Sequence, residues 1–172
     1  MGAIRRNKVA LGLVMALAAG CSSNPPSQLT ERLHNSLLRE VTEKRVVIRR
    51  LPTGARLTID SRLMFPAYSA QLDEGGQIVL NRVIEALFVV AETPVAVDDC
   101  PGGPTVANCQ LSAARATSVI GYLHNQGFDP RLLSVVRASA PVAAATRGSI
   151  GEGDVVVMTI TWRPRFASEP HA

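Results

Sequence analysis

Two kinds of charged side chain stand close together in the middle of this sequence, and their types suit the binding of a small ligand. Asp98 and Asp99 follow the apolar run 95–97, and Arg115 comes after a loop rich in Pro and Gly. A carboxylate binds an ammonium group, and the planar guanidinium of Arg binds a carboxylate through paired hydrogen bonds. If a strand delivers the acids and a helix presents Arg115, both charges can face one ligand. The spacing therefore predicts a pocket for a zwitterion, with Asp98 and Asp99 as alternative acids.

The elements that must position these side chains are predicted from apolar periodicity. Helical spacing extends over residues 28–43, 73–90 and 109–126, and strand-like runs cover residues 45–51, 56–60, 95–98, 133–138 and 155–162. We expect Asp73 to cap the second helix and Gly127 to end the third one. This order predicts an α/β fold, more closely an α+β two-layer sandwich with the helices on one face of the sheet and an antiparallel last strand.

The first predicted helix has an apolar stripe formed by Leu29, Leu33, Leu37 and Val41. One interpretation is that this stripe packs on the sheet of the same domain, or that the helix serves as a short spacer arm. The alternative is a helix that binds a partner protein.

Other apolar residues are expected to complete the core. The segment 63–72 has no periodicity, and Phe65, Tyr68 and Leu72 are expected to pin it onto the core as a loop. The buried side of the second helix is expected to consist of Val79, Leu80, Val83, Ile84, Leu87 and Phe88.

Two separated motifs resemble those of the OmpA-type peptidoglycan-binding domain. The first is Phe65-Pro-Ala-Tyr-Ser69-Ala70-Gln-Leu72, and the second is an Asn-x-x-Leu-Ser-x-x-Arg-Ala pattern that contains Asn108, Leu111 and Arg115. The resemblance covers residues 55–162 and implies a βαβαβ-β domain that binds the diaminopimelate of an uncrosslinked stem peptide. In the family, the Asp after the strand pairs with the ammonium of this ligand and the motif Arg holds its carboxylate. Alignment of the strand favours Asp99 for the first role.

The sequence departs from the family pattern at two places. The loop before Arg115 is one residue longer than usual, which leaves Asp98 and Asp99 interchangeable as candidates. The family's late Asn-Arg-Arg is replaced by Glu152-Gly153-Asp154, so we expect a less basic pocket.

The N-terminus has the pattern of an export signal. Three basic residues precede an apolar run over residues 9–19, and Ala18-Ala19-Gly20-Cys21 resembles a bacterial lipobox apart from Ala18, where Leu is usual. This predicts a lipoprotein signal peptide at residues 1–20 and an acylated Cys21, with outer-membrane sorting implied by the family. The chain has 18 Lys and Arg against 14 Asp and Glu, and removal of the three basic residues before Cys21 leaves 15 against 14, so the mature protein is nearly neutral. Nucleic acid is therefore not an expected partner.

The other two cysteines, Cys100 and Cys109, flank the Pro/Gly loop and are expected to form a disulfide in an oxidising compartment. A zinc site would need further ligands that the sequence does not offer at that spacing. The three histidines, His34, His124 and His171, are scattered, so no catalytic set is recognised. We expect no enzyme activity, no metal and no cofactor.

These patterns divide the chain into five parts. The signal peptide covers residues 1–20, a tether 21–27, the N-terminal helix and first hairpin strand 28–54, the OmpA-like domain 55–162, and an unstructured tail 163–172. The predicted function is a lipid-anchored link between the outer membrane and peptidoglycan, on the periplasmic face. The alternative is an OmpA-like lipoprotein subunit of an envelope-spanning type IVB secretion or conjugation system, with other envelope proteins as partners and a peptidoglycan site that could be degenerate.

Overall fold

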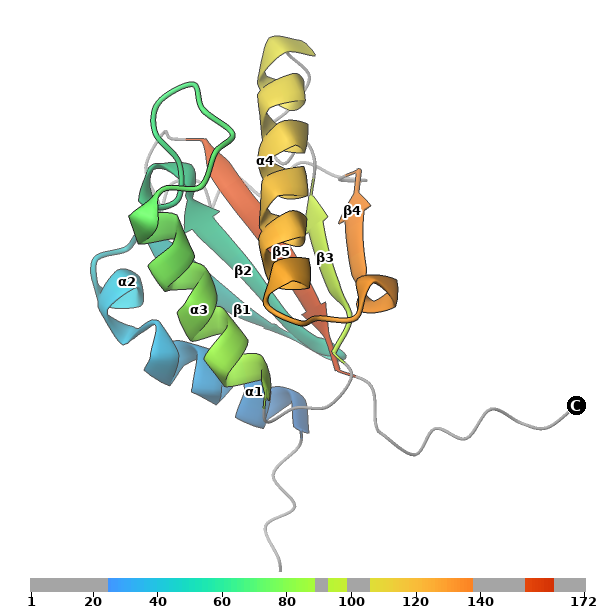
Figure 1. Ribbon diagram of the computed structural model, residues 1–172. Coiled ribbons are helices and arrows are strands. Elements are labelled where there is room, and N and C mark those ends of the chain that lie inside the picture. Colours follow the sequence, from blue (N-terminus) through green and yellow to red (C-terminus); the bar gives the residue numbers. More distant parts are fainter. Residues whose placement is uncertain (1–24, 89–92, 99–105, 138–153, 163–172) are drawn as a thin grey trace, which may run out of the picture.

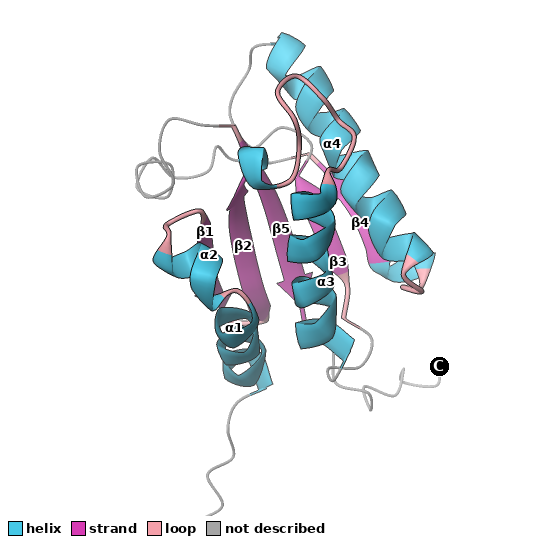
Figure 2. Ribbon diagram, turned by 60° about the vertical axis from the view of Figure 1, so that its left-hand side comes forward, coloured by secondary structure: helices cyan, strands magenta, loops and turns pink. Residues whose placement is uncertain are grey.

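The computed structural model describes residues 25–88, 93–98, 106–137 and 154–162, and these form one sheet covered by helices on one face (Figures 1 and 2). The strands are β1 (Val46–Leu51), β2 (Gly54–Asp60), β3 (Val95–Asp98), β4 (Leu133–Val136) and β5 (Val155–Thr161). The helices are α1 (Pro25–Ser36), α2 (Leu38–Thr42), α3 (Glu74–Phe88) and α4 (Val106–Asn125), with short 3-10 helices η1 (Ser61–Leu63) and η2 (Pro130–Leu132).

The strand order is β1-β2-β5-β3-β4, in which β5 lies antiparallel between β2 and β3, and β3 is parallel to β4. Parallel neighbours need a crossover connection, and α4 provides it between β3 and β4. The hairpin between β1 and β2 turns through Pro52 and Thr53. Gly54 follows because a Cβ at this position would clash with the carbonyl oxygen of Ile160. The predicted two-layer sandwich with an antiparallel last strand is confirmed.

The alternation of β5 decides which face of the sheet carries the core. Val156, Met158 and Ile160 are buried against the helices, whereas Val155 and Val157 belong to a second, smaller cluster. Because successive side chains of a strand point to opposite faces, Val155 and Val157 lie on the face opposite to the described helices. Trp162 follows the end of β5, and its backbone N–H donates to the carbonyl oxygen of Thr53 at 2.7 Å.

The N-terminal segment differs from its prediction in two respects. Helix α1 begins at Pro25, so the end of the expected tether is helical. Proline is accepted in the first turn of a helix because the N–H that it lacks has no partner there. The helix expected over residues 28–43 is broken at Leu37, whose backbone angles are φ −112° and ψ 24°.

The apolar stripe of α1 is buried within the domain. Leu29, Leu33 and Leu37 each have 0% exposure, and α1 packs against α3, β1 and β2. Packing on the domain's own sheet is therefore the correct interpretation, and this stripe is not available to a partner protein.

The start of α3 and the end of α4 show which local sequence signals correctly predicted the limits of helices. The Asp73 carboxylate accepts a hydrogen bond from the Gly76 N–H at 2.7 Å, as predicted for a helix cap. Gly127 has φ +93°, and hydrogen bonds from its N–H and that of Phe128 close the end of α4.

Phe88 was expected to be buried but is 70% exposed at the last position of α3. Its ring instead lies 6.0 Å from that of Phe128.

Several predicted segments lie outside the described residues: the signal peptide, Cys21 and the tail 163–172. Among the helices that the structure describes, none combines the length and apolar character that a membrane span requires.

Candidate ligand-binding site around Arg115

Four segments meet at one end of the sheet, the upper end in Figure 1: the end of β3, the starts of α4 and β5, and the loop between η1 and α3. The topology requires three of them to meet there. Since β5 is antiparallel to β3, it begins where β3 ends, and the crossover helix that follows β3 also begins near that end. Residues from distant parts of the sequence are thereby collected around the first half of α4.

Arg115 lies at the centre of this end, and its side chain is only 6% exposed. Its Nε donates a hydrogen bond to the carbonyl oxygen of Ser69 at 2.8 Å, and Nη2 approaches that of Pro66 at 3.5 Å. Its Nη1 forms an ion pair with the carboxylate of Asp154. The guanidinium carbon lies 5.1 Å from the centre of the Phe65 ring, a cation–π distance. Arg115 therefore joins α4, the loop and the start of β5.

Asp154 is the residue that the sequence did not assign to the site. It directly precedes β5, its side chain is 41% exposed, and its carbonyl oxygen accepts a hydrogen bond from the Ser61 N–H at 3.0 Å. Burial raises the pKa of Asp154 above its usual value, the Arg115 guanidinium opposes this rise, and the nearby Asp60 adds to it. The available signal was the acid directly before the last strand, where the resemblance called for basic residues.

Asp98 does not point toward α4. It is half-buried at the end of β3, where Val95 and Val97 are fully buried against the helices. The alternation of the strand therefore places Asp98 with Ala96 on the face opposite to the described helices. Asp99, the other predicted acid, lies outside the described residues.

The remaining motif residues occupy the first half of α4. Leu111 is half-buried and lies one turn before Arg115 on the same side of the helix. Asn108 was expected to end the loop, but α4 begins at Val106 and so contains it. Cys109 is disulfide-bonded. Both other cysteines, Cys21 and Cys100, lie outside the described residues, so its pairing with Cys100 stays a prediction.

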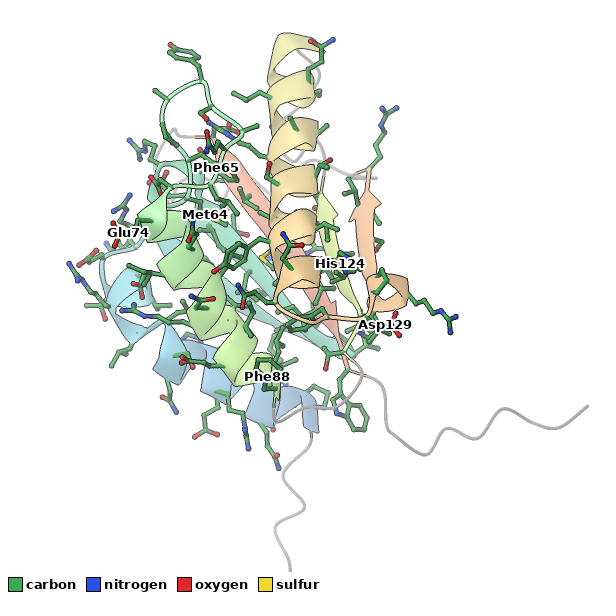
Figure 3. All side chains as sticks on the ribbon, in the orientation of Figure 1. Met64, Phe65, Glu74, Phe88, His124 and Asp129 are labelled. Atoms are coloured by element: carbon green, nitrogen blue, oxygen red, sulfur yellow. The ribbon has the colours of Figure 1, made fainter. Side chains whose placement is uncertain are left out.

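The first motif forms the loop that Arg115 holds. Phe65 is 2% exposed and Leu72 packs against the core, as predicted. Tyr68 was expected to help pin the loop but is 94% exposed. Figure 3 shows Phe65 at the loop end of the molecule and Phe88 at the opposite end of α3.

Comparison with known proteins identifies the fold. No protein-family model matches the sequence, and no curated protein matches it. A MotB-like protein from Desulfovibrio vulgaris matches in structure with a TM-score of 0.59 at 15% identity, covering 80% of this chain and 94% of that one. The cell-wall anchor of the T6SS from Pseudomonas aeruginosa matches with a TM-score of 0.58 at 24% identity, covering 78% and 99%. The periplasmic domain of Helicobacter pylori MotB matches with a TM-score of 0.55 at 19% identity, covering 72% and 85%.

The chain has the OmpA-like fold. The fold that the two motifs implied is thus confirmed, and the structure brings Phe65 and Ser69 of the first motif into contact with Arg115 of the second. At these identities the likeness shows the fold alone, so the function must be argued from the site.

Proposed function

We propose that this protein is an outer-membrane lipoprotein that binds peptidoglycan without catalysis and so links the membrane to the cell wall. Its ligand would be the diaminopimelate of an uncrosslinked stem peptide. The observation that carries this proposal is the position of Arg115 on α4, with a guanidinium held beside a partly exposed carboxylate.

The hydrogen-bonding capacity of Arg115 supports this role. A guanidinium has five N–H groups, and the bonds to Ser69, Pro66 and Asp154 use three of them. Among the described residues this leaves one donor on each terminal nitrogen. The ligand carboxylate can use these donors or replace Asp154, and the protein carbonyls keep the guanidinium plane oriented. Such a fixed fork suits a carboxylate better than a Lys ammonium would.

The acid that we propose for the ligand ammonium is Asp99. Asp98 falls on the face of the sheet opposite to the described helices, which leaves Asp99 as the other candidate acid. A contact from Asp99 would place a negative charge at the ligand ammonium, while Arg115 places a positive charge at the ligand carboxylate. Asn108 and Leu111 would complete the pocket. The assignment of Asp99 agrees with the alignment of the strand to the OmpA-type pattern.

The anchor that we propose is an acylated Cys21. Helix α1 starts at Pro25, four residues later, at the end of the molecule opposite to the loop and the start of α4 (Figure 1). An anchored chain would therefore hold its candidate site away from the membrane. Acyl chains that each contribute about 0.8 kcal/mol per buried CH₂ give durable attachment when several are present.

A subunit role in an envelope-spanning secretion or conjugation system remains the alternative proposal, and the likeness to the T6SS cell-wall anchor favours keeping it. The surface expected to bind a partner was the apolar stripe of α1, which is buried instead. Specific recovery of other outer-membrane components of such a machine with the purified protein would support this second role, and it is compatible with peptidoglycan binding.

Sedimentation with purified sacculi tests the main proposal. The variants are Arg115→Lys and Asp99→Asn, with Asp98→Asn as the matched control on the neighbouring residue. Losing one or two charge-assisted hydrogen bonds, at about 1.5–3 kcal/mol each, should weaken binding roughly tenfold or more. Asp98→Asn should bind like the wild type, and thermal melting should show that each variant is folded. Equal pelleting of all four proteins would reject the pocket.

A further inference from the structure

The backbone at Tyr68 has an unusual conformation. Its φ is +58°, in the left-handed region that residues with a Cβ seldom adopt. The Ser69 N–H donates to the carbonyl oxygen of Pro66 at 3.1 Å, so Tyr68 takes the third position of a tight turn. A positive φ at this position favours Gly or Asn. A tyrosine there is unfavourable for the backbone.

The side chain of Tyr68 gains no burial in return, since it is 94% exposed. Lys44, the other described non-glycine residue with positive φ, has a structural explanation because it follows Glu43, the C-cap of α2, at a position where helices often adopt this conformation. Tyr68 follows no helix. A strained residue with an exposed aromatic ring in a binding region is a candidate functional residue.

The loop holds Tyr68 in a defined position next to the candidate site. Arg115 binds the carbonyl oxygens on both sides of Tyr68, those of Pro66 and Ser69. Phe65 is buried beneath the guanidinium, and the Ser69 hydroxyl oxygen accepts a hydrogen bond from the Gln71 N–H at 3.0 Å. A ring mounted on a loop fixed in this way can bind a partner with little further loss of conformational freedom.

The chemistry of the ring indicates the class of ligand. An exposed tyrosine offers a flat apolar face and a hydroxyl, which together suit a molecule that is partly apolar and partly hydrogen-bonding. A sugar ring has this character, with C–H groups on one face and hydroxyl groups at its edge. In peptidoglycan the sugar is covalently attached to the stem peptide. If the third residue of the peptide is held at Arg115, its sugar lies on the order of 10 Å back along the chain.

We propose that Tyr68 is a carbohydrate-contacting residue that stacks on the N-acetylated sugar carrying the stem peptide. This inference rests on the proposed function, since it assumes that Arg115 binds the peptide. Tyr68 then adds recognition of the glycan to recognition of the amino acid. The site would distinguish a stem peptide attached to its sugar from a free peptide.

The test compares two probes by isothermal titration calorimetry with the purified protein: the free stem tripeptide and the same tripeptide attached to its disaccharide. The wild type should bind the disaccharide-peptide about 3- to 10-fold more tightly than the free peptide, the range expected for one aromatic contact. Tyr68→Phe should keep most of this difference. Tyr68→Gly should remove it while binding the free peptide as the wild type does, and its melting temperature should not fall, because Gly accepts the left-handed conformation.

Phe88→Ala is the matched control, since it removes an exposed aromatic ring at the opposite end of α3 (Figure 3). It should leave both affinities unchanged. A preference for the disaccharide-peptide that persists in Tyr68→Gly overturns the inference and leaves the proposed function standing. An equal loss of affinity for both probes in Tyr68→Gly also overturns the inference, because Tyr68 would then act by holding Arg115 in position rather than by contacting the sugar. A wild type that binds neither probe overturns the proposed function and this inference with it.

Discussion

Arg115 has two roles at the scale of single residues. Its hydrogen bonds to the Pro66 and Ser69 carbonyl oxygens hold the loop, and its ion pair with Asp154 holds the start of β5. The proposed ligand presents a second carboxylate to the same guanidinium. The Asp154 carboxylate therefore competes with the ligand carboxylate for the Arg115 guanidinium. Whether Asp154 is ionised should control how many of the Arg115 N–H groups the ligand can bind.

This competition predicts a dependence of binding on pH. The raised pKa of Asp154 means that the folded protein binds this proton more tightly than the unfolded chain does. The stabilisation due to that protonation is present at low pH and is lost as the pH rises through the raised pKa. As the pH falls toward this raised pKa, an increasing fraction of Asp154 becomes neutral, while an amino-acid carboxylate, whose pKa is lower, stays ionised. Affinity for the stem peptide should therefore rise, as measured by titration calorimetry.

Asp154→Asn separates this effect from other titrations. The amide oxygen can still accept a hydrogen bond from Arg115, but the competing negative charge is absent. This variant should bind the peptide more tightly than the wild type at neutral pH, and its affinity should change less with pH. Weaker binding by Asp154→Asn would contradict competition and would indicate that Asp154 itself holds the ligand ammonium.

At the scale of elements, an ion pair joins α2 to α3. The Glu40 carboxylate binds the Arg82 guanidinium, and their side chains are 9% and 36% exposed. The second carboxylate oxygen, Oε2, is buried without a hydrogen-bond partner among the described residues. Breaking the pair should therefore have an unequal effect, because water can solvate Arg82 but not Glu40.

Arg82→Ala should lower the free energy of unfolding by about 2–3 kcal/mol, since it leaves a buried carboxylate without its counter-charge. Glu40→Gln should have a smaller effect. Urea denaturation measures both. Arg39→Ala, which breaks the exposed pair between Arg39 and Glu43 on the same short helix, should leave the midpoint nearly unchanged. Similar losses of unfolding free energy for Arg82→Ala and Arg39→Ala would show that the α2–α3 ion pair stabilises the fold no more than an exposed pair does.

Two helical glycines provide a second prediction at this scale. Gly76 lies in the first turn of α3, where a Cβ would be 2.5 Å from the Met64 carbonyl oxygen and 2.9 Å from the Leu72 side chain. Gly76→Ala should therefore destabilise the protein by about 1–3 kcal/mol. Gly121 is an exposed residue of α4, and a Cβ there would meet nothing within 4 Å. Gly121→Ala should stabilise by about 0.5–1 kcal/mol. Thermal melting of both variants tests this, and a fall in melting temperature for Gly121→Ala would contradict it.

At the scale of the whole molecule, the start of α1 and the candidate site lie at opposite ends. The start of α1 is at the lower end in Figure 1, and the loop and the start of α4 are at the upper end. Helix α4 alone, with its 20 residues, separates the two ends by about 30 Å. An anchored protein would thus present Arg115 toward the wall rather than toward the membrane.

Cys21→Ser should release the protein from the membrane fraction without loss of sacculus binding in solution, because the change removes the proposed acyl anchor and alters none of the residues proposed to bind the ligand. Fractionation and sacculus sedimentation of the same preparation check both statements. Binding to the wall in cells should fall, since an anchored protein meets its ligand at a high effective concentration. A Cys21→Ser protein that stays in the membrane fraction would contradict the proposed anchor.

The sequence by itself determined the local features of the fold. The apolar run 155–162 predicted the strand β5, Asp73 predicted the start of α3, and Gly127 predicted the end of α4. These signals depend on neighbours within a few residues, so a linear pattern contains them. The two motifs also identified the OmpA-like fold and the place of Arg115 on α4.

Only the tertiary structure decided which groups surround Arg115. Asp154 and Ser69 are separated from it by 39 and 46 positions in the sequence, and the antiparallel register of β5 beside β3 brings the start of β5 to the same end of the sheet. The exposure of Tyr68 and Phe88 was likewise not predictable from their apolar character. Tertiary packing decides whether an apolar side chain at a turn or a helix end reaches the core, and no local pattern records that choice.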